Sequence, residues 1–348
     1  MLEGAIATRV FPACSLAVTL GGELMAQKAL GHFTYEAPSP EVNPTTLFDL
    51  ASITKVVATT AMAMILYERG LLDLETPLIA ILPEFMSGDT ADEYRREVTL
   101  RMLLAHSSGL PAYKKYFLRA PTREGLLQAA FTTALIARPG DRSAYSDIGF
   151  IILGVALERL ADESLDVFCQ REVFGPLGMT RTAFNPASAL KEKIPPTADD
   201  HTFRHRVIQG EVQDENASIL RGIAGHAGLF STAENLAIFA HAMLNSGHPI
   251  LRPETVALFS HRETSPEGTS RALGWDTPSA PSQSGKYFSP SSFGHLGYTG
   301  TSLWIDPDRQ LSITLLTNRT WPDCQNQSIK ELRPAVHDAV IEALETNR

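Results

Sequence analysis

The chain has 348 residues, of which 44% are hydrophobic and 20% are charged, and its formal net charge at pH 7 is −9. This length and composition predict a globular protein with a large buried core, built as one big domain or two interleaved ones. The negative charge, the absence of a Lys/Arg-rich block and the absence of a long apolar stretch argue against a nucleic-acid partner and a membrane span.

The cysteines and histidines give no sign of a bound metal. The three cysteines (Cys14, Cys169 and Cys324) are widely spaced, and the ten histidines form no HExxH or similar pair. We therefore expect neither a disulfide framework nor a zinc site, and no cofactor. The N-terminus lacks a basic start followed by an apolar segment, so we expect a cytoplasmic protein with no secretory leader in this sequence.

The first 70 residues predict a β-hairpin and then a buried helix. The elements are a short helix (2–9), strands at 14–20 and 23–29 joined by Gly21-Gly22, and a Pro-rich loop (36–46). The tetrad Ser52-Ile53-Thr54-Lys55 follows this loop. The apolar run after the tetrad, Val56 to Tyr67, predicts a buried helix that ends at Gly70.

The middle of the chain predicts several helices and one long irregular region. The expected helices are 99–108 (capped by Thr99), 123–137, 148–160 and 164–174. Residues 185–222 are rich in Pro, Asp, His and Arg, and they predict a loop region that borders the active site. Ser231 and Glu234 then form a capping box for a helix running to about Asn245.

The end of the chain predicts a meander of strands and a final helix. The expected strands are 294–298, 301–305 and 311–317, and the helix spans roughly 327–345. The hairpin at the start and the meander at the end must pair to bury their apolar faces, which predicts one mixed sheet with a helical insertion. Ser52 lies where the sheet region passes into the helical region, a natural position for a cleft.

The tetrad Ser52-x-x-Lys55 carries the first candidate chemistry. Residues three apart on a helix are neighbours, so the Lys55 amine can reach the Ser52 hydroxyl. A serine is a poor nucleophile until a base takes its proton, and a buried lysine can be that base in its neutral form. By itself, however, the tetrad is a weak signal, and a helix-capping serine with a lysine that covers apolar surface explains it better.

Two later stretches are candidates for the same site. In Tyr145-Ser146-Asp147 the tyrosine could relay a proton, or it could pack on the core while Ser146 caps the next helix. In the stretch 293–300, Gly297 would let a substrate approach closely and the strand N–H groups could face an oxyanion. The alternative for this stretch is a plain strand with a tight glycine turn.

Together and in this order, the three motifs resemble the serine β-lactamase and penicillin-binding-protein superfamily, whose set is S-x-x-K, S-D-N and K-T-G. The class C β-lactamase-like branch, with Tyr-x-Asn as second motif, also includes family VIII carboxylesterases and D-amino-acid peptidases. Further stretches similar to that branch are 103–111, 144–154, 175–184, 225–237 and 292–307, and the resemblance covers about residues 8–345. The G-x-S-x-G motif of α/β-hydrolases is absent from the sequence.

The resemblance implies an α+β fold in which helices flank an antiparallel sheet. Residues 1–70 and 225–348 would form the sheet domain, residues 71–224 a helical insertion domain, and the active site would lie in the cleft between them. Ser52 would be the nucleophile, and Lys55 and Tyr145 would share the work of base and acid. The backbone N–H groups of Ser52 and Tyr298 would form the oxyanion hole.

Three positions depart from the family pattern. Asp147 stands where the motif has asparagine, and an ionised carboxylate can only accept hydrogen bonds. It would favour the ammonium form of Lys55 and leave Tyr145 as the better base. His295 replaces the lysine of K-T-G and would hydrogen-bond near Tyr145 or a substrate carboxylate, while Leu296 replaces the threonine. These changes weaken the recognition of a β-lactam or D-alanine carboxylate.

Other polar and aromatic residues receive structural roles or stay open. We expect His106 and His226 to be structural hydrogen-bonding groups and both Trp275 and Trp304 to lie in the core. Three further residues could line the cleft or cap local turns: Asp214, Glu215 and Asn216.

The sequence thus predicts a serine hydrolase that acts through an acyl-enzyme on carboxylic esters or small amides. The alternatives are a peptidase or amidase acting on D-amino-acid or peptidoglycan-derived fragments, a weak β-lactamase, and a sensor that is acylated but does not turn over. The expected partner is a small ester, amide or peptide substrate, without nucleic acid or membrane. The sequence does not predict the oligomeric state.

Overall fold

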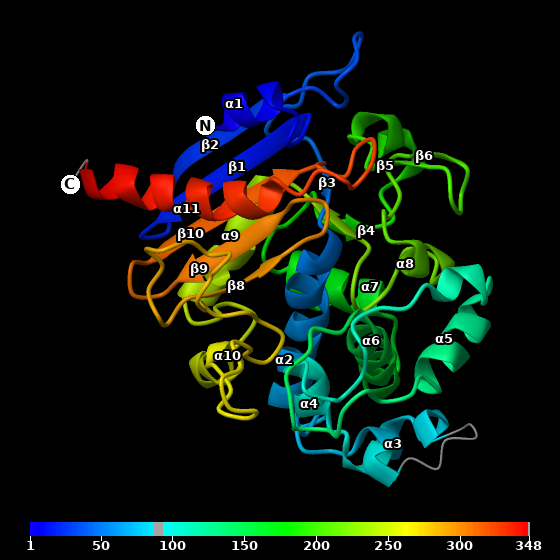
Figure 1. Ribbon diagram of the computed structural model, residues 1–348. Helices are drawn as coiled ribbons and strands as arrows, with labels where there is room; N and C mark the ends of the chain where they lie inside the picture. Colours follow the sequence, from blue (N-terminus) through cyan, green and yellow to red (C-terminus); the bar gives the residue numbers. More distant parts are fainter. Residues whose placement is uncertain (87–92, 347–348) are drawn as a thin grey trace.

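The centre of the fold is a five-stranded sheet that joins the two ends of the chain (Figure 1). The structure is a computed structural model and describes residues 1–86 and 93–346. In spatial order the strands are β2 (Glu23–Gly31), β1 (Ala13–Leu20), β10 (Leu311–Thr317), β9 (Ser302–Asp306) and β8 (Phe293–Leu296). The first hairpin and the final meander pair through β1 and β10, as the sequence predicts.

Every pairing in this sheet is antiparallel. Short connections join β1 to β2, β8 to β9 and β9 to β10, and a short turn joins only antiparallel neighbours. The long-range pair is antiparallel too, with Val18 opposite Ile313. The prediction of a mixed sheet is therefore wrong, and the antiparallel sheet implied by the family resemblance is confirmed. The division into domains at residues 71 and 224 stays a prediction.

Helices cover both faces of the sheet. On one face, α9 (Ala233–Leu244) packs against β1, β9 and β10. On the other face lie α1 (Leu2–Ala7) and α11 (Ile329–Thr346), whose apolar side chains share one core cluster with β9 and β10 (Figure 1). Because both faces are covered, β10 is buried along its whole length. Both tryptophans in question, Trp275 and Trp304, are buried in the core as expected.

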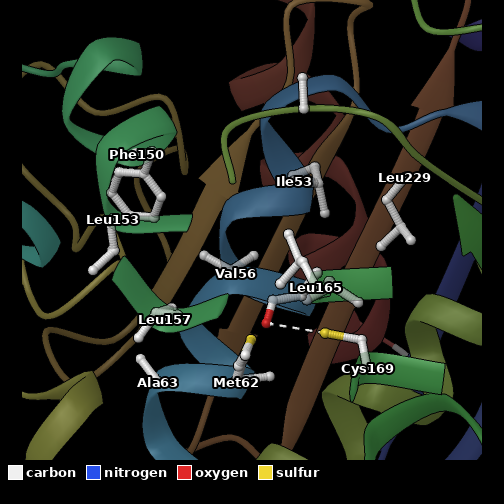
Figure 2. Packing of buried hydrophobic residues seen from close by; sticks show 14 of the residues in the cluster. Ile53, Val56, Met62, Ala63, Phe150, Leu153, Leu157, Leu165, Cys169 and Leu229 are labelled. Carbon is white, nitrogen blue, oxygen red and sulfur yellow. Dashed lines mark hydrogen bonds between the residues drawn. The ribbon is translucent and has the colours of Figure 1, made fainter. Parts of the chain in front are cut away.

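Between the two β ends the chain is mainly helical. The elements there are β3 (Phe48–Asp49), α2 (Ala61–Glu68), α3 (Leu78–Ile81), α4 (Leu100–Leu104), α5 (Arg123–Phe131), α6 (Asp147–Ala161), α7 (Leu165–Cys169), β4 (Ala183–Phe184), β5 (Ala198–Asp200), β6 (Arg206–Ile208), α8 (Glu215–Ile219), β7 (Leu229–Ser231) and α10 (Pro253–Ser260). Figure 2 shows part of their core, which contains Val56 together with Phe150 and Leu157 of α6 and Leu165 of α7. No helix within the described residues is both long and apolar enough to cross a membrane.

The segment that follows Ser52 is not the regular helix that the apolar run predicts. Residues 51–53 form a 3₁₀ turn, residues 55–60 are π-helical, and the α-helix begins only at Ala61. All six residues of the π-helical stretch are buried. π-helical turns are rare and occur frequently at functional sites, and this one begins at Lys55.

The caps and ends of several helices also differ from the prediction. Thr232, not Ser231, caps α9 and accepts a hydrogen bond from the Asn235 N–H at 3.2 Å. Ser231 belongs to β7, where its hydroxyl lies 2.7 Å from that of Thr182. Helices α4 and α5 end earlier than expected, and the sequence patterns give no sign of α10. Helix α4 stops because His106 adopts a left-handed conformation with φ of 56°.

Candidate active site

Ser52 lies in a tight turn directly after β3. The preceding residue, Ala51, has a φ of 47°, a conformation that alanine rarely adopts. The buried Asp49 carboxylate stabilises this turn by accepting hydrogen bonds from the Ala51 N–H at 2.8 Å and the Gln213 N–H at 2.7 Å. Burial raises the pKa of Asp49 to about 6, although these two hydrogen bonds act in the opposite direction. Asp49 therefore fixes the backbone directly before Ser52 and links it to the loop around residue 213.

The structure brings Ser52, Lys55 and Tyr145 into direct contact. The Ser52 Oγ accepts a hydrogen bond from Lys55 Nζ at 2.9 Å and another from the Tyr145 hydroxyl at 2.7 Å. Lys55 Nζ also donates to Asp147 Oδ1 at 2.7 Å and to the His226 carbonyl at 2.9 Å. Lys55 is completely buried, and its three acceptors match the three protons of an ammonium group.

The electrostatics of this cluster act on both candidate bases. Burial lowers the pKa of Lys55, while the Asp147 carboxylate opposes that shift. Burial, and next the Asp147 charge, raise the pKa of Tyr145 well above its usual value. Asp147 therefore disfavours both a Tyr145 phenolate and a neutral lysine. These directions favour a neutral phenol at Tyr145 and make Lys55 easier to deprotonate than an exposed lysine. The sequence analysis instead favours Tyr145 as the better base.

The turn between β8 and β9 is bound to the segment before Ser52. The Thr299 hydroxyl donates to the Asp49 carbonyl at 2.8 Å, and the Thr301 hydroxyl donates to the Leu50 carbonyl at 3.0 Å. A side chain at Gly297 would place its Cβ 1.9 Å from the Thr301 hydroxyl and 2.5 Å from the Leu50 carbonyl. This glycine is thus required by the packing of the chain on itself, and not only by the approach of a substrate. These contacts hold the turn that contains Tyr298 against the segment before Ser52, and both residues line the same cavity.

Ser52 opens into a cavity of about 770 Å³. Besides Ser52, Tyr145 and Asp147, the walls contain aromatic residues such as Tyr113, Phe117 and Tyr298. They also contain charged residues of both signs: Arg271, Arg319, Arg333, Lys115, Lys330, Asp214, Glu215 and Asp276. The described residues contain no group of three or more His, Cys, Asp or Glu side chains that could hold a metal ion.

Comparison with known proteins decides the family. A family model described as "Beta-lactamase" matches residues 1–333. The chain belongs to the β-lactamase family. It is 32% identical to the N-acetylmuramyl-L-alanine amidase of Bacillus subtilis (strain 168), over 92% of this chain and 79% of the relative. The fold resemblance predicted from the motifs is therefore confirmed, and the chain is a β-lactamase-family hydrolase.

Two solved structures show the same fold. EstCE1, described as a hydrolase with promiscuous acyltransferase activity, gives a TM-score of 0.77 at 22% identity and covers 96% of each chain. The class C β-lactamase from Rhodobacter sphaeroides gives a TM-score of 0.73 at 21% identity, covering 97% of this chain and 98% of that one. At these identities the likeness concerns the fold alone.

His295, which replaces the lysine of the family's third motif, makes no hydrogen bond to Tyr145, and its expected contact with a substrate carboxylate stays a prediction. Its Nδ1 donates to the Leu296 carbonyl at 2.7 Å, and its ring packs 5.9 Å from the Tyr145 ring without a hydrogen bond to it. Its buried Nε2 has no hydrogen-bond partner among the described residues. Burial, and then the charges of Lys55 and Arg271, lower the pKa of His295 well below its usual value. The ring is therefore neutral and does not replace the lysine charge.

Arg271 supplies a positive charge that the sequence analysis does not identify. Its guanidinium carbon lies 5.5 Å from the centre of the Tyr145 ring, and an Nη atom lies 3.6 Å from Asp276 Oδ1. The residue lies in a loop-rich segment without periodicity or a recognisable motif. The position of Arg271 beside the cavity is therefore visible only in the folded structure.

The remaining candidates are structural, wholly or in part. His106 accepts a hydrogen bond from the Ser146 N–H at 3.1 Å, and Ser146 caps α6. His226 contacts Asp214 through Nε2 at 2.9 Å. Asp214 does both of the things considered for it, since it caps α8 and lines the cavity. Glu215, the first residue of α8, lines the cavity. Asn216, in contrast, is buried and bonds the backbone of residues 114 and 117.

Replacing Asp147 with asparagine is expected to move the acid limb of kcat/KM to lower pH. If Lys55 must be neutral to accept a proton, kcat/KM rises with pH through the pKa of Lys55. The Asp147 charge raises that pKa, so its removal lowers the pKa and moves the limb down by about 1–3 units.

The pH dependence of ester hydrolysis measures this shift. Glu215→Gln is the matched control, because Glu215 lines the same cavity but makes no contact with Lys55. If the acid limb of kcat/KM in Asp147→Asn stays in place or moves to higher pH, that limb reports the titration of a group other than Lys55.

Proposed function

We propose that this β-lactamase-family protein hydrolyses carboxylic esters and small amides through an acyl-enzyme on Ser52. The observation that carries the proposal is the pair of hydrogen bonds at Ser52 Oγ, 2.9 Å from Lys55 Nζ and 2.7 Å from the Tyr145 hydroxyl. A nucleophile within hydrogen-bond reach of a base and a proton relay is the arrangement that acyl transfer requires.

The reaction follows from these contacts in two halves. Ser52 Oγ bonds to the substrate carbonyl carbon while its proton passes to Lys55, directly or through Tyr145. The amides of Ser52 and Tyr298 stabilise the resulting oxyanion; no described residue accepts a hydrogen bond from the Tyr298 amide. Tyr145 then protonates the leaving alcohol or amine, and water releases the acyl group by the reverse proton path.

The decisive experiment is a substrate panel. The protein is incubated with p-nitrophenyl esters, D-peptides and a chromogenic cephalosporin, and the acylated residue is identified by mass spectrometry. Continuous turnover with acyl-Ser52 supports a hydrolase, whereas one equivalent of product followed by no further release indicates the acyl-binding sensor. Acylation at any residue other than Ser52 would refute the proposal.

Activated short-chain esters are expected to be hydrolysed orders of magnitude faster than β-lactams. Asp147 and Leu296 cannot donate the hydrogen bonds that the family's asparagine and threonine offer, and neutral His295 brings no charge. Each lost contact costs about 0.5–1.5 kcal/mol, so two or three together lower kcat/KM by about 10²-fold or more. Arg271 offsets part of this loss, because it places a cation in the same cavity.

The measurement is kcat/KM for p-nitrophenyl butyrate against a chromogenic cephalosporin in one buffer. Asp147→Asn combined with Leu296→Thr should shift the ratio toward the cephalosporin. Leu296→Val, which changes the shape without adding a hydroxyl, is the control. Comparable values for the two substrates in the unmodified protein would overturn the expected preference.

A second candidate is an amidase acting on a peptidoglycan-derived fragment. Two observations favour it: the 32% identity to the N-acetylmuramyl-L-alanine amidase of Bacillus subtilis, and a cavity of about 770 Å³ with carboxylates and guanidiniums in its walls. Such a cavity is larger than a short acyl group needs, and it suits a sugar–peptide with charges of its own. The test is whether the protein releases L-alanine from N-acetylmuramyl-L-alanine. This candidate requires release by the unmodified protein and none by Ser52→Ala.

A further inference from the structure

A buried arginine binds the back of the turn that carries the Tyr298 amide. Arg333 of α11 is only 5% exposed, and its guanidinium donates from Nη2 to the Gly297 carbonyl at 2.7 Å and from Nε to the Gly300 carbonyl at 3.2 Å. It also lines the catalytic cavity. Within the described residues, no carboxylate forms an ion pair with it. A buried cation without a carboxylate partner is unfavourable unless something else compensates its charge.

The carbonyl that Arg333 binds belongs to the peptide group that contains the Tyr298 N–H. The two ends of a peptide group are coupled by resonance across the C–N bond. A cation hydrogen-bonded to the oxygen draws electron density toward it and makes the N–H a stronger donor. Arg319, the other buried arginine nearby, donates instead to the Tyr298 carbonyl at 2.8 Å, which belongs to the following peptide group.

We propose that Arg333 is a positioning residue of the oxyanion hole: it orients the Gly297–Tyr298 peptide and polarises it, so that the Tyr298 N–H binds the oxyanion more strongly. This inference rests on the proposed function, because it requires an oxyanion formed at Ser52. Arg333 does not touch the reacting atoms itself and acts through the peptide group.

The energetics of the resting protein agree with this role. Burial, and then the neighbouring charge of Arg319, lower the pKa of Arg333 to about 9. In the resting protein, the positive charge of Arg333 is therefore poorly compensated. In the transition state, the negative charge that develops on the substrate oxygen compensates it. An interaction that strengthens only as the transition state forms increases kcat rather than ground-state binding.

The simpler explanation is that Arg333 only caps two carbonyls to stabilise the turn. Arg95 is a buried arginine elsewhere in the chain that also binds backbone carbonyls. It is 1% exposed, its guanidinium donates to the carbonyls of Phe131 and Thr133, and it does not line the catalytic cavity. The two arginines can thus be compared, because both are buried and both donate to backbone carbonyls, but only Arg333 binds the peptide group of the oxyanion hole.

The test compares Arg333→Gln with Arg95→Gln in the full-length protein. The kinetic readouts are kcat and KM for p-nitrophenyl butyrate. The structural readout is the infrared stretching frequency of the acyl-enzyme carbonyl, labelled with ¹³C, which falls as the oxyanion hole polarises that carbonyl more strongly. Thermal unfolding of both variants separates loss of stability from loss of catalysis.

Arg333→Gln is expected to raise the carbonyl frequency and lower kcat about tenfold, with KM nearly unchanged. Removal of a whole oxyanion-hole donor costs about 10²–10³-fold, and here the donor is weakened rather than lost. Arg95→Gln should lower the melting temperature without changing the frequency or kcat. Arg333→Lys keeps the charge but loses the two-point contact, so it should give an intermediate carbonyl frequency and lower kcat about threefold. This variant replaces Arg333→Gln in the test if the glutamine variant does not fold.

A wild-type carbonyl frequency and kcat in whichever Arg333 variant folds would overturn the inference. In that case normal acylation of Ser52 leaves the proposed function intact. Failure of the unmodified protein to form any acyl-Ser52 would instead refute the proposed function, and the inference about Arg333 with it.

Discussion

Ser52→Ala is expected to abolish turnover and leave the fold intact. Ser52 Oγ is the atom on which both Lys55 and Tyr145 converge, and in a related type of catalytic cluster removal of the nucleophile lowers kcat by about 10⁶-fold. The stability effect should be small, because Lys55 keeps its contacts with Asp147 and the His226 carbonyl. Steady-state hydrolysis of p-nitrophenyl butyrate, mass spectrometry for the acyl group and thermal unfolding measure these effects.

The chain offers a matched control for this substitution. Ser15 is a buried serine of β1 whose hydroxyl has no hydrogen-bond partner among the described residues. Ser15→Ala removes the same atom from the protein and should leave kcat unchanged, since it lies in the sheet and outside the cavity. If Ser52→Ala keeps more than a few per cent of the wild-type rate, Ser52 is not the nucleophile.

Tyr145→Phe is expected to lose far more activity than His295→Ala. Phenylalanine keeps the ring that packs 4.7 Å from His106 and beneath Arg271, but it lacks the hydroxyl that reaches Ser52. A positioned acid or base contributes about 10²–10⁴-fold, so a loss of this size is expected for the tyrosine variant. His295 has no hydrogen bond to the catalytic cluster, and its truncation should affect the rate per folded molecule much less.

The leaving group makes this comparison sharper. Because burial and Asp147 raise the pKa of Tyr145, the phenol keeps its proton and can donate it to a leaving oxygen or nitrogen. A poor leaving group needs this proton more than p-nitrophenolate does, so the Tyr145→Phe loss should grow along a series of esters with increasingly basic alcohols. Near-wild-type rates with every ester would place the proton relay elsewhere and leave Lys55 as the sole base.

Sequence reasoning brought Ser52 and Lys55 together as candidates because their contact depends on a short spacing. Ser52 and Lys55 are three residues apart, which keeps them adjacent even though the turn is 3₁₀ and then π-helical rather than α-helical. The glycine turn of the first hairpin and the apolar strands at both ends were equally local signals, and they fixed the pairing of the sheet. Tyr145 was found through its motif, and no local rule predicted its 2.7 Å contact with Ser52.

The sequence by itself determined the family, the strands of the sheet and the candidate nucleophile, since these depend on local patterns and short spacings. Only the tertiary structure decided which charges surround them. Arg271 comes from an irregular loop and Arg333 from the last helix, and folding alone brings both to the cavity. The structure also showed that one carboxylate, Asp147, acts on both Lys55 and Tyr145. The physical reason is that burial and charge act through space, so the protonation of a group depends on neighbours that are distant in the sequence.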